Sequence, residues 1–211
     1  SGPGSHERVV FAASSSAYGD DPALPKAETQ LPRPLSPYAA SKLAGEQALA
    51  AWSRSYGLGA VSLRYFNVFG PRQPADSAYA AVIAAFAKRL LAGEAPTIFG
   101  DGLQSRDFTS VTNAVLATLL AGASDRPLSG EVINVGTGKR TTLRELARTM
   151  ADGCGAPHVQ PIFAAARLGD VPHSLADIGR ARELLGYAPV EGLEGGLKET
   201  IAWYKSEMAG S

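Results

Sequence analysis

Short apolar runs alternate with longer segments of helical pattern, and this alternation is what most constrains the fold. Residues 9–13 (VVFAA) predict a buried parallel strand, and residues 60–66 and 131–135 predict two more. We expect helices at residues 38–56, 78–92, 112–121, 141–152, 177–185 and 193–205. Because strands and helices alternate, the expected fold class is α/β.

The helix expected at residues 38–56 has clear start and stop signals. Ser36 and Pro37 supply an N-cap and a first-turn proline, and Gly57 ends the pattern. Tyr38 and Lys42 stand four residues apart, so they share one face of this helix. An ammonium group beside a phenol favours the ionised phenol, which is one way to make a general base. The pair alone also fits a plain helix start with a solvated lysine.

Three serines, Ser14, Ser15 and Ser16, follow the first strand. They lie at its carboxyl end, where open α/β sheets place their ligands. Hydroxyl groups in this position also commonly cap the next turn, so the pattern leaves both roles open. Residues 20–37 hold five prolines and predict an extended loop between the serines and the helix.

Composition excludes several classes of protein. The chain has 20 basic and 20 acidic residues, which gives no electrostatic case for binding nucleic acid or an anionic membrane surface. No apolar run approaches the roughly 20 residues of a membrane span, and we expect a cytoplasmic protein. Cys154 is the only cysteine, which excludes an internal disulfide and a cysteine-based metal cluster. No HExxH or other metal signature occurs, so we expect no metal.

Several stretches of the sequence together resemble a known family. They occur in the family's order and cover most of residues 8–204, at residues 13–20, 35–42, 63–71, 100–102, 105–108, 134–136 and 167–171. On these motifs the chain resembles the extended short-chain dehydrogenase/reductases and, within them, the UDP-hexose 4-epimerases, which act on UDP-glucose or UDP-N-acetylglucosamine. The resemblance implies a doubly wound, Rossmann-like parallel sheet, of which the C-terminal part is present, plus a smaller α/β substrate domain.

One departure from the family pattern concerns the cofactor. A dinucleotide site normally opens with a strand, a glycine-rich turn and a helix, and no such unit precedes Val9. The resemblance therefore implies that the N-terminal glycine-rich part of the enzyme is absent, and we expect this chain alone to be inactive. Residues 1–6 resemble an expression scar and chain start. We expect residues 7–70 to belong to the dinucleotide-binding domain and residues 71–211 mainly to the substrate domain, with about residues 108–136 returning to the dinucleotide-binding core.

The resemblance also implies roles for individual residues. It makes Ser14, Tyr38 and Lys42 catalytic, and it places these three and Tyr65 against bound NAD. The substrate-binding residues that it implies are Ser15, Ser16, Asn67, Arg106, Arg167, Asp170 and Ser174.

Simpler roles compete with some of these assignments. Arg106 and Arg167 match positions that grip a diphosphate, which suits the planar donors of arginine. Each could instead form a surface ion pair, Arg106 with Asp107 and Arg167 with Asp170. Nothing in the sequence pairs His173 with a carboxylate or a nucleophile, so we assign it no role.

The implied function is that of an NAD-dependent nucleotide-sugar 4-epimerase. Tyr38 would take the proton of the 4-hydroxyl while NAD accepts hydride from C4, and hydride would return to the opposite face of the 4-keto sugar. In the family, the position of Ser174 lines the pocket for the C2 substituent of the sugar. The resemblance therefore implies that this small side chain leaves room for an N-acetyl group, which extends the expected substrates to UDP-N-acetylhexosamines. Alternatively, Ser174 only caps the helix near Asp177.

Other functions stay open from the sequence. Dehydratases of the same superfamily carry an Asp-Glu pair where Ser15 and Ser16 stand, which disfavours elimination of water. The chain could serve another NAD-dependent nucleotide-sugar reaction, such as a reduction or decarboxylation. It could also be a catalytically silent fragment that acts only as a binding or dimerising module. The family forms dimers through the helix at residues 38–56, so we expect a homodimer with a UDP-sugar as its ligand.

Overall fold

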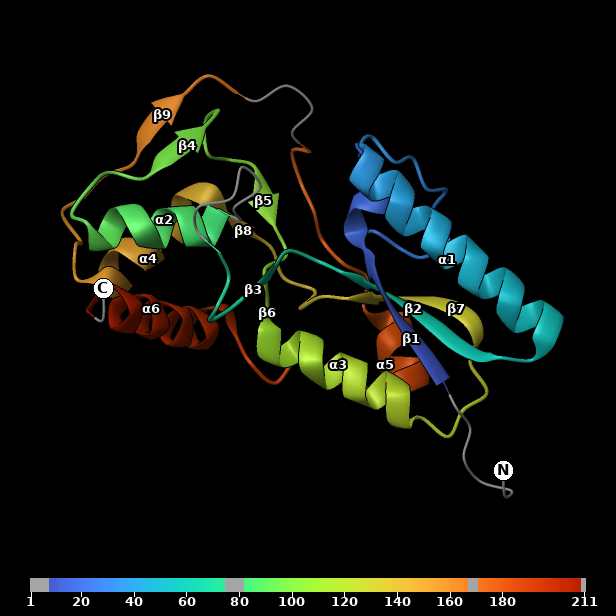
Figure 1. Cartoon of the computed structure of the whole chain (residues 1–211). Helices are drawn as coiled ribbons and strands as arrows, with labels where there is room; N and C mark the ends of the chain where they lie inside the picture. The colour runs from blue at the N-terminus through green and yellow to red at the C-terminus, as the bar shows by residue number, and fades with distance from the viewer. Residues whose placement is uncertain (1–7, 75–81, 167–170, 210–211) are drawn as a thin grey trace.

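Three parallel strands form the central sheet of the computed structural model, which describes residues 8–74, 82–166 and 171–209. The strands are β1 (Arg8–Ser14), β2 (Gly59–Tyr65) and β7 (Ser129–Val135), in the order β1-β2-β7. Ser14 pairs with Tyr65, and Tyr65 pairs with Val135, so the carboxyl ends of all three strands coincide. The expected α/β class and its three strands are confirmed (Figure 1).

Helices cover both faces of this sheet. On one face lies α1 (Pro37–Tyr56), which begins where the Ser36 hydroxyl accepts the N–H of Ala39 at 3.1 Å and ends at Gly57 in the left-handed conformation. On the other face lie α3 (Val111–Ala123) and α5 (Gly179–Leu185). The core on that face contains Val61, Leu63, Ala117, Ala121, Ile133, Val135, Ala181, Leu185 and Tyr187. We call this assembly the sheet lobe.

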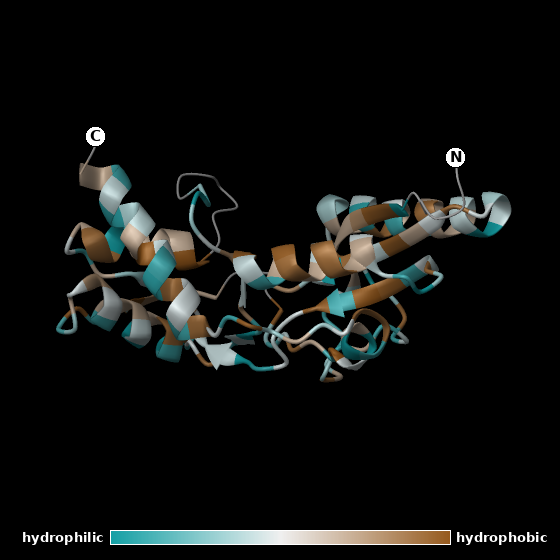
Figure 2. Ribbon diagram, turned by 90° about the horizontal axis from the view of Figure 1, so that it is seen from below, coloured by the Kyte–Doolittle hydropathy of each residue, from teal (hydrophilic) through white to brown (hydrophobic). Residues whose placement is uncertain are grey.

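A second lobe is built mainly from helices α2 (Val82–Leu91), α4 (Leu143–Cys154) and α6 (Leu193–Ala209). Its core contains Phe69, Ile83, Phe86, Leu90, Leu146, Met150, Leu197 and Tyr204. Burying such a large apolar side chain stabilises the fold by roughly 1.5–3 kcal/mol. Figure 2 shows the two lobes at opposite ends of the molecule, with polar residues spread along the outer helices. We call this second assembly the helical lobe.

The expected helices are all present, with shifted ends. The helix expected from residue 141 begins after Thr142, because Thr142 and Glu145 form a capping box. The expected start of α2 at residue 78 lies outside the described residues. In the part of the chain that the structure describes, no helix is long and apolar enough to cross a membrane. The assignment of residues 7–70 and 71–211 to two domains stays a prediction.

Short elements that the sequence pattern did not predict connect the two lobes and build the second one. They are the 3₁₀ helix η1 (Ser15–Tyr18) and the strand pairs β3 (Val68–Phe69) with β6 (Thr109–Ser110), β4 (Thr97–Phe99) with β9 (Ile162–Ala164), and β5 (Ser105–Arg106) with β8 (Thr141–Thr142). Strands of two or three residues are too short to show a periodic pattern.

One extended segment, residues 171–177, contacts both lobes. It forms a β-bridge through Ala176 to Lys26 in the sheet lobe and another through His173 to Ser105 in the helical lobe. The main-chain N–H of Lys26 donates to Leu175 at 2.7 Å, and that of Ser174 donates to Ser105 at 3.0 Å. This segment therefore fixes the two lobes around the carboxyl end of the sheet.

Candidate active site

A cavity of about 760 Å³ lies at the carboxyl end of the sheet, between the two lobes. All nine of the expected site residues that fall within the described ranges line it: Ser14, Ser15, Ser16, Tyr38, Lys42, Tyr65, Asn67, Arg106 and Ser174. The other two expected residues, Arg167 and Asp170, lie outside the described residues. The fold thus brings together side chains from β1, η1, α1, β2, β5 and the segment at residues 171–177.

Ser14 is the first of the three serines, residues 14–16, at the end of β1, and we call these three residues the serine turn. Ser14 Oγ accepts the main-chain N–H of Ser16 at 3.2 Å and the Ser16 hydroxyl at 2.8 Å. Ser14 therefore does cap η1, as the simpler interpretation held. With both acceptor positions occupied, the Ser14 hydroxyl keeps its own proton as a donor for the cavity.

Tyr38 and Lys42 occupy the first turns of α1. Tyr38 is 58% exposed, and Lys42 Nζ lies 5.9 Å from the centre of its ring. Lys42 Nζ also donates to the carbonyl of Ala12 in β1 at 2.9 Å, so the ammonium is held by the sheet. This contact depends on the close approach of α1 to β1 at Gly45, where a Cβ would lie 2.3 Å from the ring of Phe11.

Tyr65 is the last residue of β2, and Asn67 stands two residues further along the chain. The Tyr65 hydroxyl lies 2.6 Å from Thr118 Oγ1, which itself donates to Ala114, so Tyr65 is the donor of this pair. Burial raises the pKa of Tyr65, which keeps the phenol neutral. Asn67 has a φ of 36°, a left-handed conformation that asparagine tolerates. Its Nδ2 donates to the Asp107 carbonyl at 3.1 Å, which leaves Oδ1 as an acceptor.

Arg106 lies in β5 at the helical-lobe side of the cavity. Its Nη1 donates to the carbonyls of Ser105 at 3.0 Å and Pro172 at 3.1 Å. The neighbouring Asp107 carboxylate accepts instead from Thr137, Gly138 and Ala176, through four hydrogen bonds of 2.6–3.2 Å. Burial raises the pKa of Asp107 even though these bonds favour its charged form. Asp107 thus fixes the main chain at Thr137, Gly138 and Ala176, next to the cavity.

Ser174 is half-buried, and β5 fixes its backbone. It forms no cap of α5, because the residue before that helix is Ile178 and the Gly179 N–H is taken by Asp177 at 2.8 Å. The capping interpretation of Ser174 is therefore wrong. Its side chain belongs to the wall of the cavity.

Lys26 and His173 also line the cavity; the sequence analysis did not consider Lys26 and assigned no role to His173. Lys26 is only 2% exposed, and burial lowers its pKa; its Nζ donates to the Asp21 carbonyl. His173 lies with its Nδ1 2.9 Å from the Ser105 hydroxyl. Both are brought into place by partners far along the chain, so no local pattern could have indicated them.

The charges around the cavity have one sign. Lys26, Lys42 and Arg106 line it, and among the described residues no carboxylate side chain does. Such a lining attracts an anionic ligand. An adjoining pocket of about 230 Å³ shares Asn67 and Arg106 with the cavity. Its wall is mainly apolar, formed by Phe69, Val82, Ile83, Phe99, Phe108 and Leu143, and it suits a flat ring next to an anionic group.

A parallel α/β sheet whose carboxyl end presents a serine turn opposite a Tyr-x-x-x-Lys helix defines the class of short-chain dehydrogenases and reductases. The family model described as the NAD dependent epimerase/dehydratase family matches residues 3–136. The chain belongs to this family.

Its relatives include enzymes that act on nucleotide sugars. UDP-glucose 4-epimerase of Mycolicibacterium smegmatis is 40% identical over 201 residues, covering 95% of this chain and 63% of the relative. A structure of UDP-N-acetylglucosamine 4-epimerase from Methanobrevibacter ruminantium M1, in complex with UDP-N-acetylmuramic acid, is 42% identical with a TM-score of 0.91 and covers 96% of this chain and 64% of that one.

A third relative was solved with two bound molecules. UDP-glucuronic acid 4-epimerase from Bacillus cereus, in complex with UDP-glucuronic acid and NAD, is 32% identical with a TM-score of 0.86 and covers 95% of this chain and 62% of that one. Other relatives carry the names of a dehydratase and a decarboxylase. The chain therefore spans less than two thirds of the length of these relatives.

Proposed function

We propose that the whole protein is an NAD-dependent nucleotide-sugar 4-epimerase that interconverts UDP-hexoses, including UDP-N-acetylhexosamines, through a 4-keto intermediate. The observation that carries this proposal is the convergence of Ser14, Tyr38 and Lys42 on one cavity whose described lining holds cations and no carboxylate. Such a reaction requires a proton acceptor, a hydroxyl that donates a hydrogen bond, and positive charges that attract a diphosphate.

The residues present fit the nicotinamide half of NAD. Tyr38 is 58% exposed, the Lys42 ammonium is held beside it by Ala12, and the neutral Tyr65 lines the same cavity. We propose that these three residues hold the nicotinamide ribose. When bound, NAD supplies a hydride acceptor and donor for C4 of the sugar.

Each remaining step falls to a side chain of this protein. Tyr38 takes the proton from the 4-hydroxyl, with the Lys42 ammonium held beside its ring by the Ala12 carbonyl. Ser14 donates a hydrogen bond to the same sugar oxygen, while Ser15 and Ser16 contact other hydroxyls. Asn67 offers Oδ1 to the substrate. Arg106 binds the diphosphate, as we also propose for Arg167, with Asp170 contacting the ribose.

Elimination of water is less well supported than epimerisation. A dehydratase needs an acid and a base to remove a hydroxyl and a proton from neighbouring carbons. Ser15 and Ser16 stand where superfamily dehydratases carry Asp and Glu, and the described cavity lining offers no carboxylate in their place. We therefore keep another NAD-dependent nucleotide-sugar reaction only as the second candidate.

A homodimer in the cytoplasm is part of the proposal. Helix α1 exposes the small residues Ala40, Ala44, Ala48 and Ala51 on the face turned away from the sheet, and Trp52 is 60% exposed at its end. Small side chains let two helices approach closely across a two-fold axis.

The test is an assay of the whole protein with UDP-glucose, UDP-galactose and their two N-acetyl counterparts, together with mass spectrometry for co-purifying NAD. We expect bound NAD and interconversion within both pairs without added cofactor, because the net reaction is redox-neutral. If neither bound NAD nor interconversion is found, the protein is only a binding module. Calorimetry with NAD on these 211 residues would then measure what this part binds by itself.

A further inference from the structure

A row of buried polar groups crosses the sheet just behind the cavity. Arg64 on β2 pairs in register with Ala13 on β1 and with Asn134 on β7, one residue before the strands end at Ser14, Tyr65 and Val135. Arg64 is 2% exposed and Asn134 is fully buried. These side chains lie on the sheet face that α1 covers. The proposed proton and phosphate contacts use neither of them.

Arg64 forms a two-point contact with α1. Its Nε donates to Glu46 Oε1 at 2.9 Å and its Nη2 donates to Glu46 Oε2 at 2.7 Å. Glu46 is 1% exposed and lies one helical turn beyond Lys42 and two turns beyond Tyr38, on the same face. The third nitrogen, Nη1, is buried with no hydrogen-bond partner among the described residues. The guanidinium therefore relies on Glu46 and on its next neighbour, Tyr18, to offset its removal from water.

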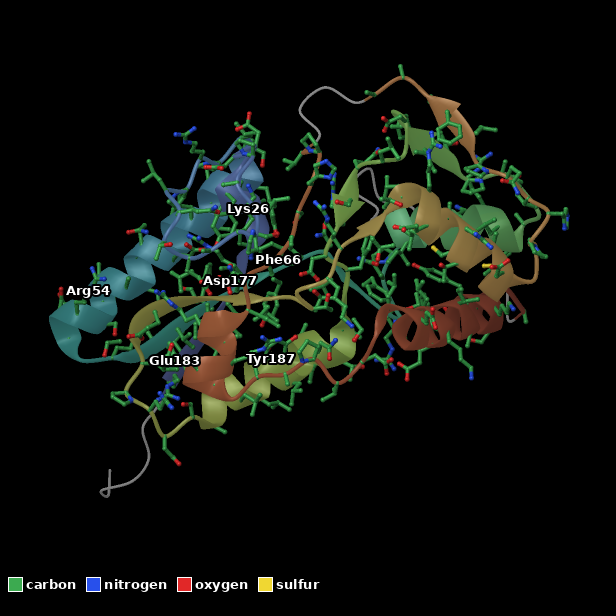
Figure 3. The ribbon with its side chains drawn as sticks, turned by 180° about the vertical axis from the view of Figure 1, so that it is seen from behind. Lys26, Arg54, Phe66, Asp177, Glu183 and Tyr187 are labelled. Atoms are coloured by element: carbon green, nitrogen blue, oxygen red, sulfur yellow. The ribbon has the colours of Figure 1, made fainter. Side chains whose placement is uncertain are left out.

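Tyr18 links the same guanidinium to the serine turn. It is the last residue of η1, which starts directly after Ser14, and its ring centre lies 4.6 Å from the guanidinium carbon of Arg64. The Tyr18 hydroxyl donates to Asn134 Oδ1 at 2.7 Å. Asn134 Nδ2 in turn donates to the carbonyls of Lys26 at 2.8 Å and Asp177 at 3.2 Å. Figure 3 shows Lys26 and Asp177 near the centre of the molecule, beside the end of the sheet.

Helix α1 also contacts β1 through Lys42 and Gly45, but among the described residues its only buried charged contact with the sheet is made by Glu46. Its buried residues are Ala39, Glu46 and Ser53, and none of them is a large apolar side chain that would lock into a groove. The Ser53 hydroxyl donates to Leu58, just beyond the end of its own helix, and so does not fix α1 to the sheet. Glu46 is thus the buried side chain through which α1 is fixed in one position, because a bidentate contact with a planar guanidinium allows a single geometry.

We propose that Arg64, acting through Glu46 and Tyr18, is a positioning residue that sets the distance between the Tyr38 hydroxyl on α1 and the Ser14 hydroxyl on the serine turn. This inference rests on the proposed epimerisation for its kinetic consequence. Its structural part, that Arg64 holds α1 and η1 in register, stands without it. A small displacement of a catalytic group lowers the rate of the chemical step while leaving the diphosphate contacts intact.

The test compares Arg64→Lys and Glu46→Gln with Arg54→Lys in the whole protein. Lysine keeps the charge of Arg64 but loses the two-point contact, and Arg54 is an exposed arginine near the far end of α1, labelled in Figure 3. For both buried variants we expect kcat with UDP-glucose to fall about tenfold or more, with KM changed less than about twofold and NAD retained. The Arg54 variant should match the unmodified protein.

Amide hydrogen exchange supplies a readout that does not depend on catalysis. In the buried variants we expect faster exchange across residues 37–46, with residues 82–91 of the helical lobe unchanged. Unchanged kcat, or a loss that accompanies a higher KM and faster exchange throughout the chain, would overturn the positioning role. If the unmodified protein shows no epimerisation, the proposed function fails, and the exchange result still decides whether Arg64 holds α1.

Tyr18→Phe covers the case in which the charged variants do not fold. It keeps the ring against Arg64 and removes only the hydrogen bond to Asn134. We expect a smaller fall in kcat, about threefold to tenfold, again at unchanged KM and with faster exchange confined to residues 14–19 and 37–46. Wild-type kcat and exchange in this variant would exclude Tyr18 from the positioning unit.

Discussion

At the scale of single residues, the phenol of Tyr38 is the group on which the proposed chemistry depends most. We expect Tyr38→Phe in the whole protein to lose at least about 99% of the epimerisation rate while NAD and UDP-sugar still bind, because acid/base groups contribute 10²-fold or more. Stopped assays and equilibrium dialysis would measure the two properties separately. A variant that keeps more than about a tenth of the rate would exclude Tyr38 as the base.

Ser174 determines substrate breadth in our proposal, because its small side chain lines the cavity and caps no helix. We expect Ser174→Tyr to suppress turnover of UDP-N-acetylglucosamine and UDP-N-acetylgalactosamine while sparing UDP-glucose, since the ring would fill the space for the acetamide group. Ser174→Ala is the matched control and should spare both pairs. Equal losses on both pairs in the tyrosine variant would show that the residue is structural.

At the scale of secondary-structure elements, the contact between α1 and β1 depends on a missing side chain. A Cβ at Gly45 would lie 2.3 Å from the Phe11 ring, so we expect Gly45→Ala to lower the free energy of unfolding by about 1–3 kcal/mol. Gly122→Ala is the control, because its Cβ would meet nothing within 4 Å and a helical alanine is favoured by up to about 1 kcal/mol. Urea titration should therefore give shifts of opposite sign, and equal shifts would refute the packing argument.

The elements differ in how far the sequence alone could predict them. Strand β1 carries a continuous apolar run, and β2 and β7 are rich in β-branched and other apolar residues. Helix α1 has a cap and a terminal glycine, so the positions of these elements follow from local chemistry. The pairs β3–β6, β4–β9 and β5–β8 rest on long-range contacts between segments of two or three residues. For the same reason the serine and Tyr38–Lys42 motifs indicated the cavity, whereas Lys26 and His173 enter it only through bridges to Ala176 and Ser105.

At the scale of the whole molecule, buried tyrosines make stability sensitive to alkaline pH. Burial raises the pKa of Tyr18, Tyr65 and Tyr187, and the Tyr187 hydroxyl donates to Gly136 at 2.9 Å. In the unfolded chain these phenols ionise near pH 10. Their contribution is therefore fully present below about pH 10 and is lost as the pH rises toward the folded-state values.

We accordingly expect the free energy of unfolding to fall above about pH 10, by up to about 1.4 kcal/mol per pH unit for each buried tyrosine. Urea midpoints between pH 8 and 11 would measure this slope. Tyr187→Phe should flatten it, whereas Tyr56→Phe should not, because Tyr56 is 74% exposed. An unchanged slope in the Tyr187 variant would contradict the assignment.

The segment at residues 171–177 is hydrogen-bonded to Lys26 on one side and to Ser105 on the other. The two lobes cannot move apart at the cavity without breaking one of these two sets of hydrogen bonds. The protection of these amides from exchange therefore reports how firmly the lobes are held together. A molecule that holds the lobes together should slow proton exchange at the amides of Lys26, Ser105, Ser174 and Asp177, whether or not it is converted. Candidate ligands could thus be ranked by occupancy alone, with no reporter dye and no coupled enzyme.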